Sequence, residues 1–329
     1  MSSRHSSTIS WCRRISRGDS NAVSAENETI DTPAESSGGK GFQPNTVSGT
    51  LIVAVGLCLI CSLLVSGGAV LLRPSIQANK RLKMQRNVLI AAGKFDEATN
   101  SDADIPGLFE SVQAVLVNLP GRTGMGELEV DDANAGQLNS DLDVDTYDPR
   151  KAAKNPEQSV AIPADLDEAG IRRREQVATA YIVKGENGAV SQIVLPVYGK
   201  GLWSTLYGFL ALKADNPNDM PVTGITFYEH GETPGLGGEV DNPKWKAQWP
   251  GKEILADGGK PILDVTKPGQ ASETNEVDGM SGATITSNGV EGLVNYWLGP
   301  DGFGPFLERY RDGQVNFTAE SQGRVESAE

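Results

Sequence analysis

The chain has 329 residues, 38% of them hydrophobic, and its mean hydropathy is −0.30. That length allows one or two domains, and the mean hydropathy excludes a protein with many membrane spans. With 29 basic and 43 acidic side chains the net charge is −14. The phosphate backbone of a nucleic acid would repel such a chain, so nucleic acid is not expected as a partner.

Cysteine and histidine are scarce. The three cysteines are Cys12, Cys58 and Cys61, and the two histidines are His5 and His230. The residues after position 61 therefore hold neither an internal disulfide nor a thiolate metal site, and the histidines form no cluster. Redox chemistry in this chain would therefore require an organic cofactor.

A membrane anchor is expected near the N-terminus. Residues 1–45 are rich in polar residues and glycine and are expected to be a disordered extension. Residues 51–72 then run for 22 positions without a charge. As a helix they would be about 33 Å long, enough to cross a hydrocarbon core of roughly 30 Å. We therefore predict a single transmembrane helix over 46–73. Within it Cys58 and Cys61 are interpreted as two small apolar side chains, although a partner helix could complete a site with them.

The charges around this helix do not settle its orientation. One basic residue, Lys40, precedes the apolar run closely, whereas five follow it: Arg73, Lys80, Arg81, Lys83 and Arg86. Taken literally, the positive-inside rule puts the C-terminal side in the cytoplasm. Large domains, however, cross membranes largely regardless of charge, so the orientation stays open at this point.

Residues 74–177 are expected to form the helical and loop region of a soluble domain. A helix is predicted over 74–94, with Pro74 in a first turn. Shorter helical pieces such as Ile105–Asn118 and a loop over Asp131–Asp148 follow. The basic run Ile171–Arg174 is interpreted as part of a solvated face.

Residues 178–310 are predicted to form a sheet and helix region, and 311–329 a polar tail. Runs rich in β-formers lie at 178–183, 190–197, 208–213 and 223–228 and are separated by turn signals, which predicts an antiparallel meander. A short helix is expected over 243–250 and a longer one over 288–298, capped by Asn288 and Glu291. The fold class is therefore α+β, an antiparallel sheet flanked by helices on a single N-terminal transmembrane helix.

Two glycine-rich segments are candidate ligand loops. Glu232–Gly238 carries Gly235, Gly237 and Gly238, which allow a backbone to approach a flat ligand, although a tight loop after a strand explains them too. In Asp278–Gly289 small residues surround Thr284, and a predicted helix begins within about four residues. A helix N-terminus favours a phosphate group, although this segment taken alone is explained equally by a capping loop rich in Ser and Thr.

The second segment resembles a known modification motif. Ser281-Gly-Ala-Thr284, preceded by Asp278, is similar to the flavinylation motif of subunits that carry covalent FMN. The resemblance extends to Gly199–Lys213, Gly231–Val240, the Tyr147-x-x-x-x-Ala-Ala-Lys154 segment and Trp245-x-x-Gln-Trp249. Together they resemble the covalent-FMN subunit of the Na⁺-translocating NADH:quinone reductases, in order, over about residues 46–310.

The resemblance implies a set of site residues. Thr284 would be esterified to the FMN phosphate by a separate flavin transferase that uses FAD, with Ser281, Gly282 and Ala283 shaping the access loop. Backbone N–H groups near Thr286 and Ser287 would hold the phosphate. Candidate contacts of the isoalloxazine ring are Glu232, Thr233, Leu236 and Gly237. Trp203 either stacks on the ring or lies in the core, and Asp278 would serve transferase recognition or the transferase's metal. No catalytic acid or base and no metal ligand is nominated.

The resemblance also implies a place in a membrane complex. The chain would be a translocase subunit of the bacterial inner membrane with its soluble domain in the periplasm. It would pass electrons from a membrane iron–sulfur centre to the FMN of a partner subunit and eventually to quinone, with NADH binding and Na⁺ transport on other subunits. Its expected partners are those subunits, the flavin transferase and membrane lipid. Two alternatives stay open: the flavin subunit of an Rnf-type ferredoxin-linked complex, and a cofactor-free membrane-anchored binding or assembly module.

Overall fold

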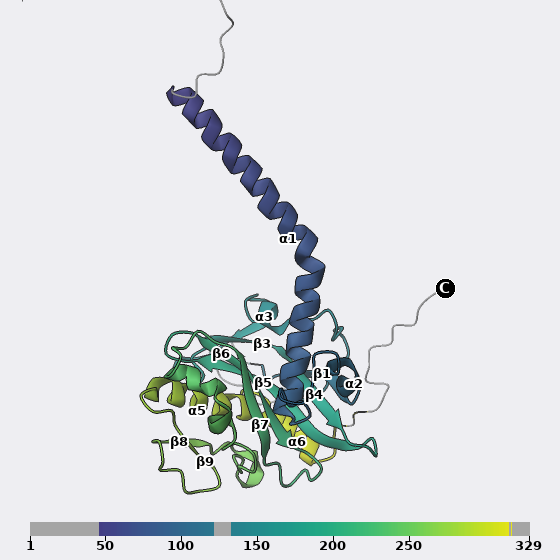
Figure 1. Ribbon diagram of the computed structural model, residues 1–329. Coiled ribbons are helices and arrows are strands. Elements are labelled where there is room, and N and C mark those ends of the chain that lie inside the picture. The colour runs from purple at the N-terminus through teal and green to yellow at the C-terminus, as the bar shows by residue number, and fades with distance from the viewer. Residues whose placement is uncertain (1–45, 122–132, 316, 318–329) are drawn as a thin grey trace, which may run out of the picture. The chain divides into compact units, whose positions relative to one another are not determined.

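The structure is a computed structural model that describes residues 46–121, 133–315 and 317 (Figure 1). The predicted extension 1–45 and the predicted tail beyond residue 317 lie outside the described residues. The chain divides into two units, residues 1–68 and 69–329.

The described residues contain the following elements. The helices are α1 (Val47–Ala91), α2 (Ile105–Phe109), α3 (Pro149–Ala152), α4 (Pro243–Lys246), α5 (Thr284–Leu298) and α6 (Gly304–Arg311), with the 3-10 turns η1 (Gly237–Asp241) and η2 (Asp257–Gly259). The strands are β1 (Val112–Asn118), β2 (Ser159–Ala161), β3 (Arg173–Glu175), β4 (Val177–Lys184), β5 (Val190–Lys200), β6 (Thr205–Lys213), β7 (Val222–Glu229), β8 (Asp264–Thr266) and β9 (Glu276–Asp278).

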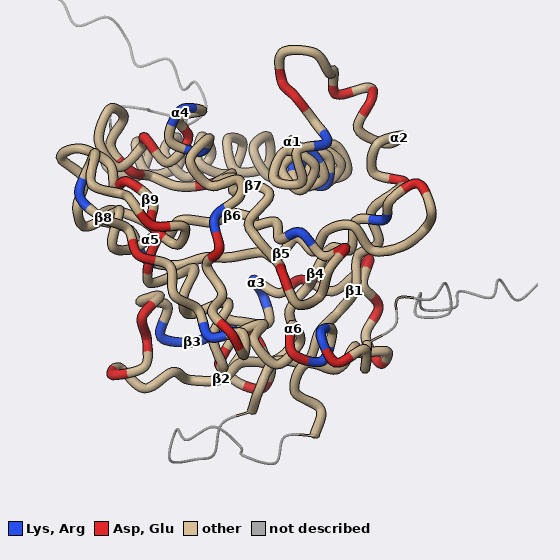
Figure 2. The backbone as a smooth tube through the Cα atoms, turned by 90° about the horizontal axis from the view of Figure 1, so that it is seen from below, with Lys and Arg blue, Asp and Glu red and all other residues tan. Residues whose placement is uncertain are grey.

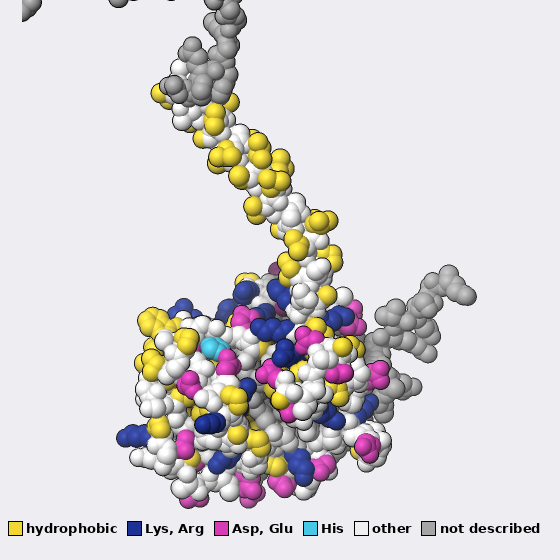
Figure 3. Space-filling view, viewed as in Figure 1, with side chains coloured by type: hydrophobic (Ala, Val, Ile, Leu, Met, Phe, Trp, Pro, Cys, Tyr) yellow, Lys and Arg dark blue, Asp and Glu magenta, His cyan; other side chains and the backbone are white. Residues whose placement is uncertain are grey.

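The N-terminal part of α1 is long and apolar enough to cross a membrane. None of its most apolar 18-residue window is buried in the structure, and Figure 3 shows hydrophobic side chains along its exposed surface. Pro74 does not begin a new helix, because α1 continues through it from Val47 to Ala91. An exposed apolar surface of this length would be unstable in water, so the helix is suited to a bilayer.

The central sheet confirms the predicted meander and adds a strand. Its order is β1-β4-β5-β6-β7, with every neighbouring pair antiparallel. The predicted helical piece Ile105–Asn118 is wrong beyond Phe109, because Val112–Asn118 forms the edge strand β1. Its β-branched valines favour extended backbone, and pairing with β4 satisfies the backbone polar groups.

Side chains of the sheet alternate between two cores. In β5, Ile193, Leu195 and Val197 pack into a large cluster with α5 and α6, whereas Val194 points into a second cluster with the end of α1. Figure 2 shows the end of α1 and helix α6 on opposite sides of the sheet. Both faces of the sheet are therefore covered, as the period of two along a strand allows.

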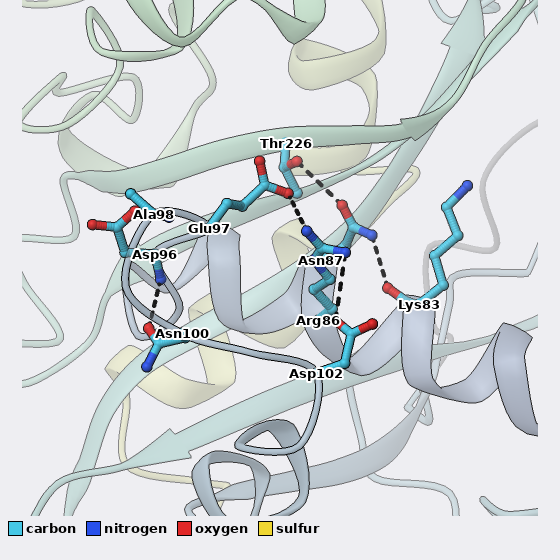
Figure 4. A network of polar contacts seen from close by, with 9 residues as sticks. All are labelled: Lys83, Arg86, Asn87, Asp96, Glu97, Ala98, Asn100, Asp102 and Thr226. Carbon is cyan, nitrogen blue, oxygen red and sulfur yellow. Dashed lines mark hydrogen bonds and ion pairs between the residues drawn. The ribbon is translucent and has the colours of Figure 1, made fainter.

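Polar contacts fix the last turns of α1 to the sheet (Figure 4). Asn87 donates to the Lys83 carbonyl over 2.7 Å and accepts from the Thr226 hydroxyl of β7 over 3.4 Å. Arg86 pairs with Glu97 over 2.7 Å and with Asp102 over 3.5 Å. The C-terminal end of α1 is therefore an integral part of the sheet domain.

The predicted solvated face at Ile171–Arg174 is wrong for Arg174. This side chain is fully buried and donates to the carbonyls of Pro120 over 2.6 Å and Glu175 over 3.0 Å. The pairing of β2 with β3 carries it inward, where those buried carbonyls require a donor. The neighbouring Glu175 is also buried and accepts from the Tyr198 hydroxyl over 2.6 Å.

Two predicted helices have different bounds in the structure, and one predicted loop is confirmed where it is described. The predicted helix 243–250 is helical only over Pro243–Lys246. The helix predicted from 288 begins at Thr284, so Asn288 is not its cap, and Glu291 accepts instead from the Val265 N–H of β8 over 3.0 Å. Residues 133–148 hold no helix or extended strand, as expected for the loop, whereas 131 and 132 lie outside the described residues.

Candidate functional site

The glycine-rich segment after β7 folds around a buried carboxylate. Glu232 is 5% exposed. A Cβ added to Gly237 would lie 2.7 Å from its Oε2, and one added to Gly201 would lie 2.7 Å from its Oε1. Glycine is therefore needed at both positions because the carboxylate occupies the space of a side chain.

Five donors hold this carboxylate, and the weakest of them is the Ser204 hydroxyl, which lies 3.4 Å from Oε1. Glu232 Oε2 accepts from the Thr286 hydroxyl over 2.7 Å and from the Leu202 N–H over 3.2 Å. Oε1 accepts from the N–H groups of Trp203 and Ser204 over 2.9 and 3.1 Å. One side chain thus joins the β5–β6 turn, the segment after β7 and the first turn of α5.

The protonation state of Glu232 follows from these contacts. Burial acts to raise the pKa of the carboxyl group, but the hydrogen bonds from Thr286 and from the three N–H groups outweigh it. The pKa of Glu232 therefore lies below its ordinary value, and the group is ionised at neutral pH.

The start of α5 presents an open helix N-terminus. Its first main-chain bond runs from the Ser287 N–H to the Ala283 carbonyl over 2.9 Å, and no side chain caps it. The N–H groups of Thr284, Ile285 and Thr286 lie ahead of that bond and have no helical partner. Together with the helix dipole they favour an anionic group.

Thr284 is accessible at this N-terminus. Its side chain is exposed and makes no hydrogen bond within the part of the chain that the structure describes. Gly282 just before it has a φ of +73°, a conformation that glycine adopts readily. A Cβ there would lie 3.1 Å from the Leu236 side chain, so the two glycine-rich segments lie side by side.

Helix α5 reaches this position by close packing on the end of β5. A Cβ on Gly289 would overlap the Lys200 carbonyl, and one on Gly292 would overlap the Glu168 carbonyl. Trp297 at the far end of the helix donates to the Tyr198 carbonyl over 2.7 Å. These contacts fix the position of α5, and therefore of its N-terminus, against the end of β5.

The structure brings together most, but not all, of the predicted site residues. Glu232, Gly237 and Thr286 are in direct contact, and Leu236 lies against Gly282. Ser287 is buried, and its hydroxyl accepts from the Met280 N–H over 2.9 Å, so only its main chain belongs to the helix start. The remaining predicted site residues are exposed Ser281 and Thr233 and buried Ala283.

The structure shows the exposure of Trp203 and the hydrogen-bond partners of Asp278. The core alternative for Trp203 is wrong, because its side chain is 67% exposed. The main-chain N–H of Trp203 donates to Glu232, and the indole ring is exposed to solvent. Asp278 Oδ1 accepts from the N–H groups of Gln270 and Ala271 over 2.8 and 2.9 Å, so this oxygen serves the loop before β9.

Exposed apolar side chains lie on the segments that meet at the open helix end, and we call them the apolar rim. We use the term for four exposed side chains carried by the segments that Glu232 joins: Leu202 (43%), Trp203 (67%), Leu236 (44%) and Ile285 (59%). An uncapped helix N-terminus favours an anionic group, and apolar side chains favour a flat apolar ligand, so the two features suit a ligand that has both parts. Within the described residues no group of three or more His, Cys, Asp or Glu is placed to hold a metal ion.

Sequence reasoning missed two residues of this site. Ser204 donates its N–H to Glu232, and its hydroxyl accepts from the Gly231 N–H over 2.6 Å. His230 bonds both Glu232 and Asp241. Neither has a local sequence signal, because their partners are set by loops that meet only in the folded chain.

Comparisons with known proteins agree with this geometry. Residues 201–299 match the model of a family described as FMN-binding domain. The NqrC subunit of the Na(+)-translocating NADH-quinone reductase of Pasteurella multocida is 42% identical over 273 residues, which cover 83% of this chain and 97% of that protein. The same subunit of Pseudomonas aeruginosa is 45% identical over 271 residues, 81% of this chain and 97% of that protein.

A solved structure has the same fold. The crystal structure of Shewanella oneidensis NqrC superposes with a TM-score of 0.60 at 36% sequence identity, over 71% of this chain and 99% of that chain. The similarity therefore covers both the sheet and the segments that build the site.

Proposed function

The chain belongs to the NqrC family, a subunit of the Na⁺-translocating NADH-quinone reductases, and we propose that it carries FMN as a phosphoester on Thr284. It is a subunit of a translocase complex, it has an FMN-binding domain, and one apolar helix anchors it in a membrane. The observation that supports the covalent link is the exposed Thr284 side chain at an uncapped helix N-terminus.

The residues present fit a flavin phosphate. The three leading N–H groups of α5 would hold phosphate oxygens, and Gly282, two residues before Thr284, adds no side chain there. Residues 281–288 contain no acidic side chain that would repel the phosphate. The apolar rim offers Trp203 and Leu236 to the isoalloxazine ring, whereas Glu232 acts by holding Thr286 and the β5–β6 turn in place.

In the attachment reaction, the Thr284 hydroxyl oxygen forms a bond to phosphorus and loses its proton. A separate transferase supplies the FMN group from FAD, with AMP as the leaving group. The ester keeps the cofactor in a site that is open to water. When bound, FMN takes up and gives up electrons one or two at a time.

We further propose that the chain relays electrons from a membrane iron–sulfur centre to the FMN of a partner subunit. This role requires no general acid or base. It does require an accessible flavin, and the exposure of Trp203, Leu236 and Ile285 supports that accessibility. The relatives named above favour this role over that of the flavin subunit of an Rnf-type complex, and the FMN-binding domain disfavours a cofactor-free module.

The attachment is tested by removing the hydroxyl. Wild type, Thr284→Ala and the matched control Thr274→Ala, an exposed threonine outside the site, are each produced with the transferase. Wild type and Thr274→Ala should fluoresce in a denaturing gel and carry the mass of one FMN ester, whereas Thr284→Ala should do neither. Unmodified wild type, or modified Thr284→Ala, would refute the assignment.

The proposed periplasmic location has its own test. The transferase and its substrate must share a compartment, which supports the periplasm despite the basic residues after the span. Protease added outside spheroplasts should digest the sheet domain of wild type. Protection of the domain until the membrane is broken would refute this orientation.

A further inference from the structure

His230 connects three parts of the site through both ring nitrogens. It follows β7, and its side chain is 13% exposed. Nε2 lies 2.8 Å from Asp241 Oδ2 in η1, and Nδ1 accepts from the Glu232 N–H over 3.2 Å. The imidazole therefore closes the loop 231–240, which contains four of the candidate flavin contacts: Glu232, Thr233, Leu236 and Gly237.

These two contacts select one form of the imidazole. A main-chain N–H can only donate, so Nδ1 must present a lone pair to Glu232. The ring proton of a neutral histidine then lies on Nε2 and is donated to Asp241. Protonation at Nδ1 would place an N–H against the Glu232 N–H and break that bond.

The charged groups around His230 come from several elements. Asp241 faces it from η1, and Glu232 follows it two residues later. Glu229 precedes it on β7, with its carboxylate on Arg150 of α3 over 2.9 Å. Helix α4 also packs against β7 and carries Lys244 and Lys246.

We propose that His230 is a positioning residue for the flavin site. In its neutral Nε2–H form it fixes the main chain at Glu232, whose carboxylate in turn holds Thr286 beside the anchor Thr284. The effect on the flavin rests on the proposed function. The tautomer of His230 and its contacts with Glu232 and Asp241 do not depend on that function.

The structural part is tested by the tautomer. The chain has two histidines, so His5→Ala leaves His230 as the single histidine signal. In full-length His5→Ala carrying Thr284→Ala and ¹⁵N-labelled histidine, long-range ¹H–¹⁵N spectra at neutral pH should show an unprotonated Nδ1 and a protonated Nε2. The opposite tautomer, or a doubly protonated ring, would overturn the proposal without any dependence on flavin.

The positioning role is tested by two variants that each keep one contact. His230→Asn retains an acceptor near the Nδ1 position, and His230→Gln retains a donor near the Nε2 position. If the Glu232 contact is decisive, His230→Gln should slow covalent FMN loading about fivefold, as loss of one hydrogen bond implies, and His230→Asn should load close to wild type. Equal loading by both variants and wild type would overturn the role.

The test of the role of His230 is kept separate from the test of the attachment on Thr284. Mass analysis of each sample identifies covalent FMN, so a failure of the attachment on Thr284 is recognised separately from a failure of the role of His230.

Discussion

The hydroxyl of Thr286 donates to the carboxylate of Glu232 over 2.7 Å, and this bond joins residues 54 positions apart. Thr286 lies in the first turn of α5, and Glu232 lies in the glycine-rich segment after β7. Because Glu232 also accepts from the β5–β6 turn, the helix N-terminus and the apolar rim are held by one buried anion.

We expect Glu232→Gln to destabilise the domain by about 2–4 kcal/mol at pH 7, because an amide N–H₂ would face donors that a carboxylate accepts. Denaturant unfolding of protein without flavin measures this loss, with the exposed Glu157→Gln as control. The pKa of Glu232 is lowered, so its contribution is present at neutral pH and lost as the pH falls through the folded-state pKa. If the difference in the free energy of unfolding between wild type and Glu232→Gln stayed constant as the pH fell, this account would be contradicted.

The contribution of Glu175 to the free energy of unfolding should depend on pH in the opposite sense to that of Glu232. Burial raises its pKa to about 7, so the folded state favours the protonated form. Between the ordinary value of 4.5 and about 7 the folded chain binds the extra proton, and stability falls as the pH rises. Relative to Glu175→Gln, wild type should lose roughly 2–3 kcal/mol between pH 5 and pH 8. Urea unfolding at both pH values checks this, and parallel stability curves would disprove it.

Two glycines in helices should respond to alanine with opposite signs. Gly289→Ala places a methyl group against the Lys200 carbonyl and should cost about 1–3 kcal/mol despite the better helix propensity of alanine. Gly107→Ala in α2 meets nothing within 4 Å and should be neutral or stabilising by up to about 1 kcal/mol. Thermal unfolding of both variants tests the pair. A neutral Gly289→Ala would mean that α5 is not seated on β5 as described.

The Trp203→Ala variant should distinguish a role of Trp203 in contacting the flavin from a role in packing the protein core. Because the indole is 67% exposed, we expect the free energy of unfolding of the flavin-free protein to change by less than about 0.5 kcal/mol. Loss of an aromatic neighbour should increase the fluorescence of attached FMN and shift its absorbance. Unaltered flavin spectra would remove Trp203 from the set of ring contacts, and a large loss of stability would restore the core interpretation.

Some features of this protein could be predicted from short stretches of sequence. The uncharged run at 51–72 predicted an apolar helix, and runs rich in β-formers between turn signals predicted the four strands of the meander. Both signals work because a segment buried in a bilayer or between two layers needs a continuous run of apolar residues, which the local sequence shows directly. The proposal for Thr284 came from a local motif together with the ordered set of resembling segments, and it stays a proposal; the structure adds that Thr284 is the first residue of α5.

Tertiary structure alone decided the surroundings of the polar side chains. Arg174 stands in a basic run but is buried against the carbonyls of Pro120 and Glu175, and Trp203 is exposed although tryptophan is usually buried. Glu232 and His230 acquire their roles from partners brought by other loops. The physical reason is that a buried polar group takes whichever donor or acceptor the folded chain places within reach, and sequence spacing does not encode that distance.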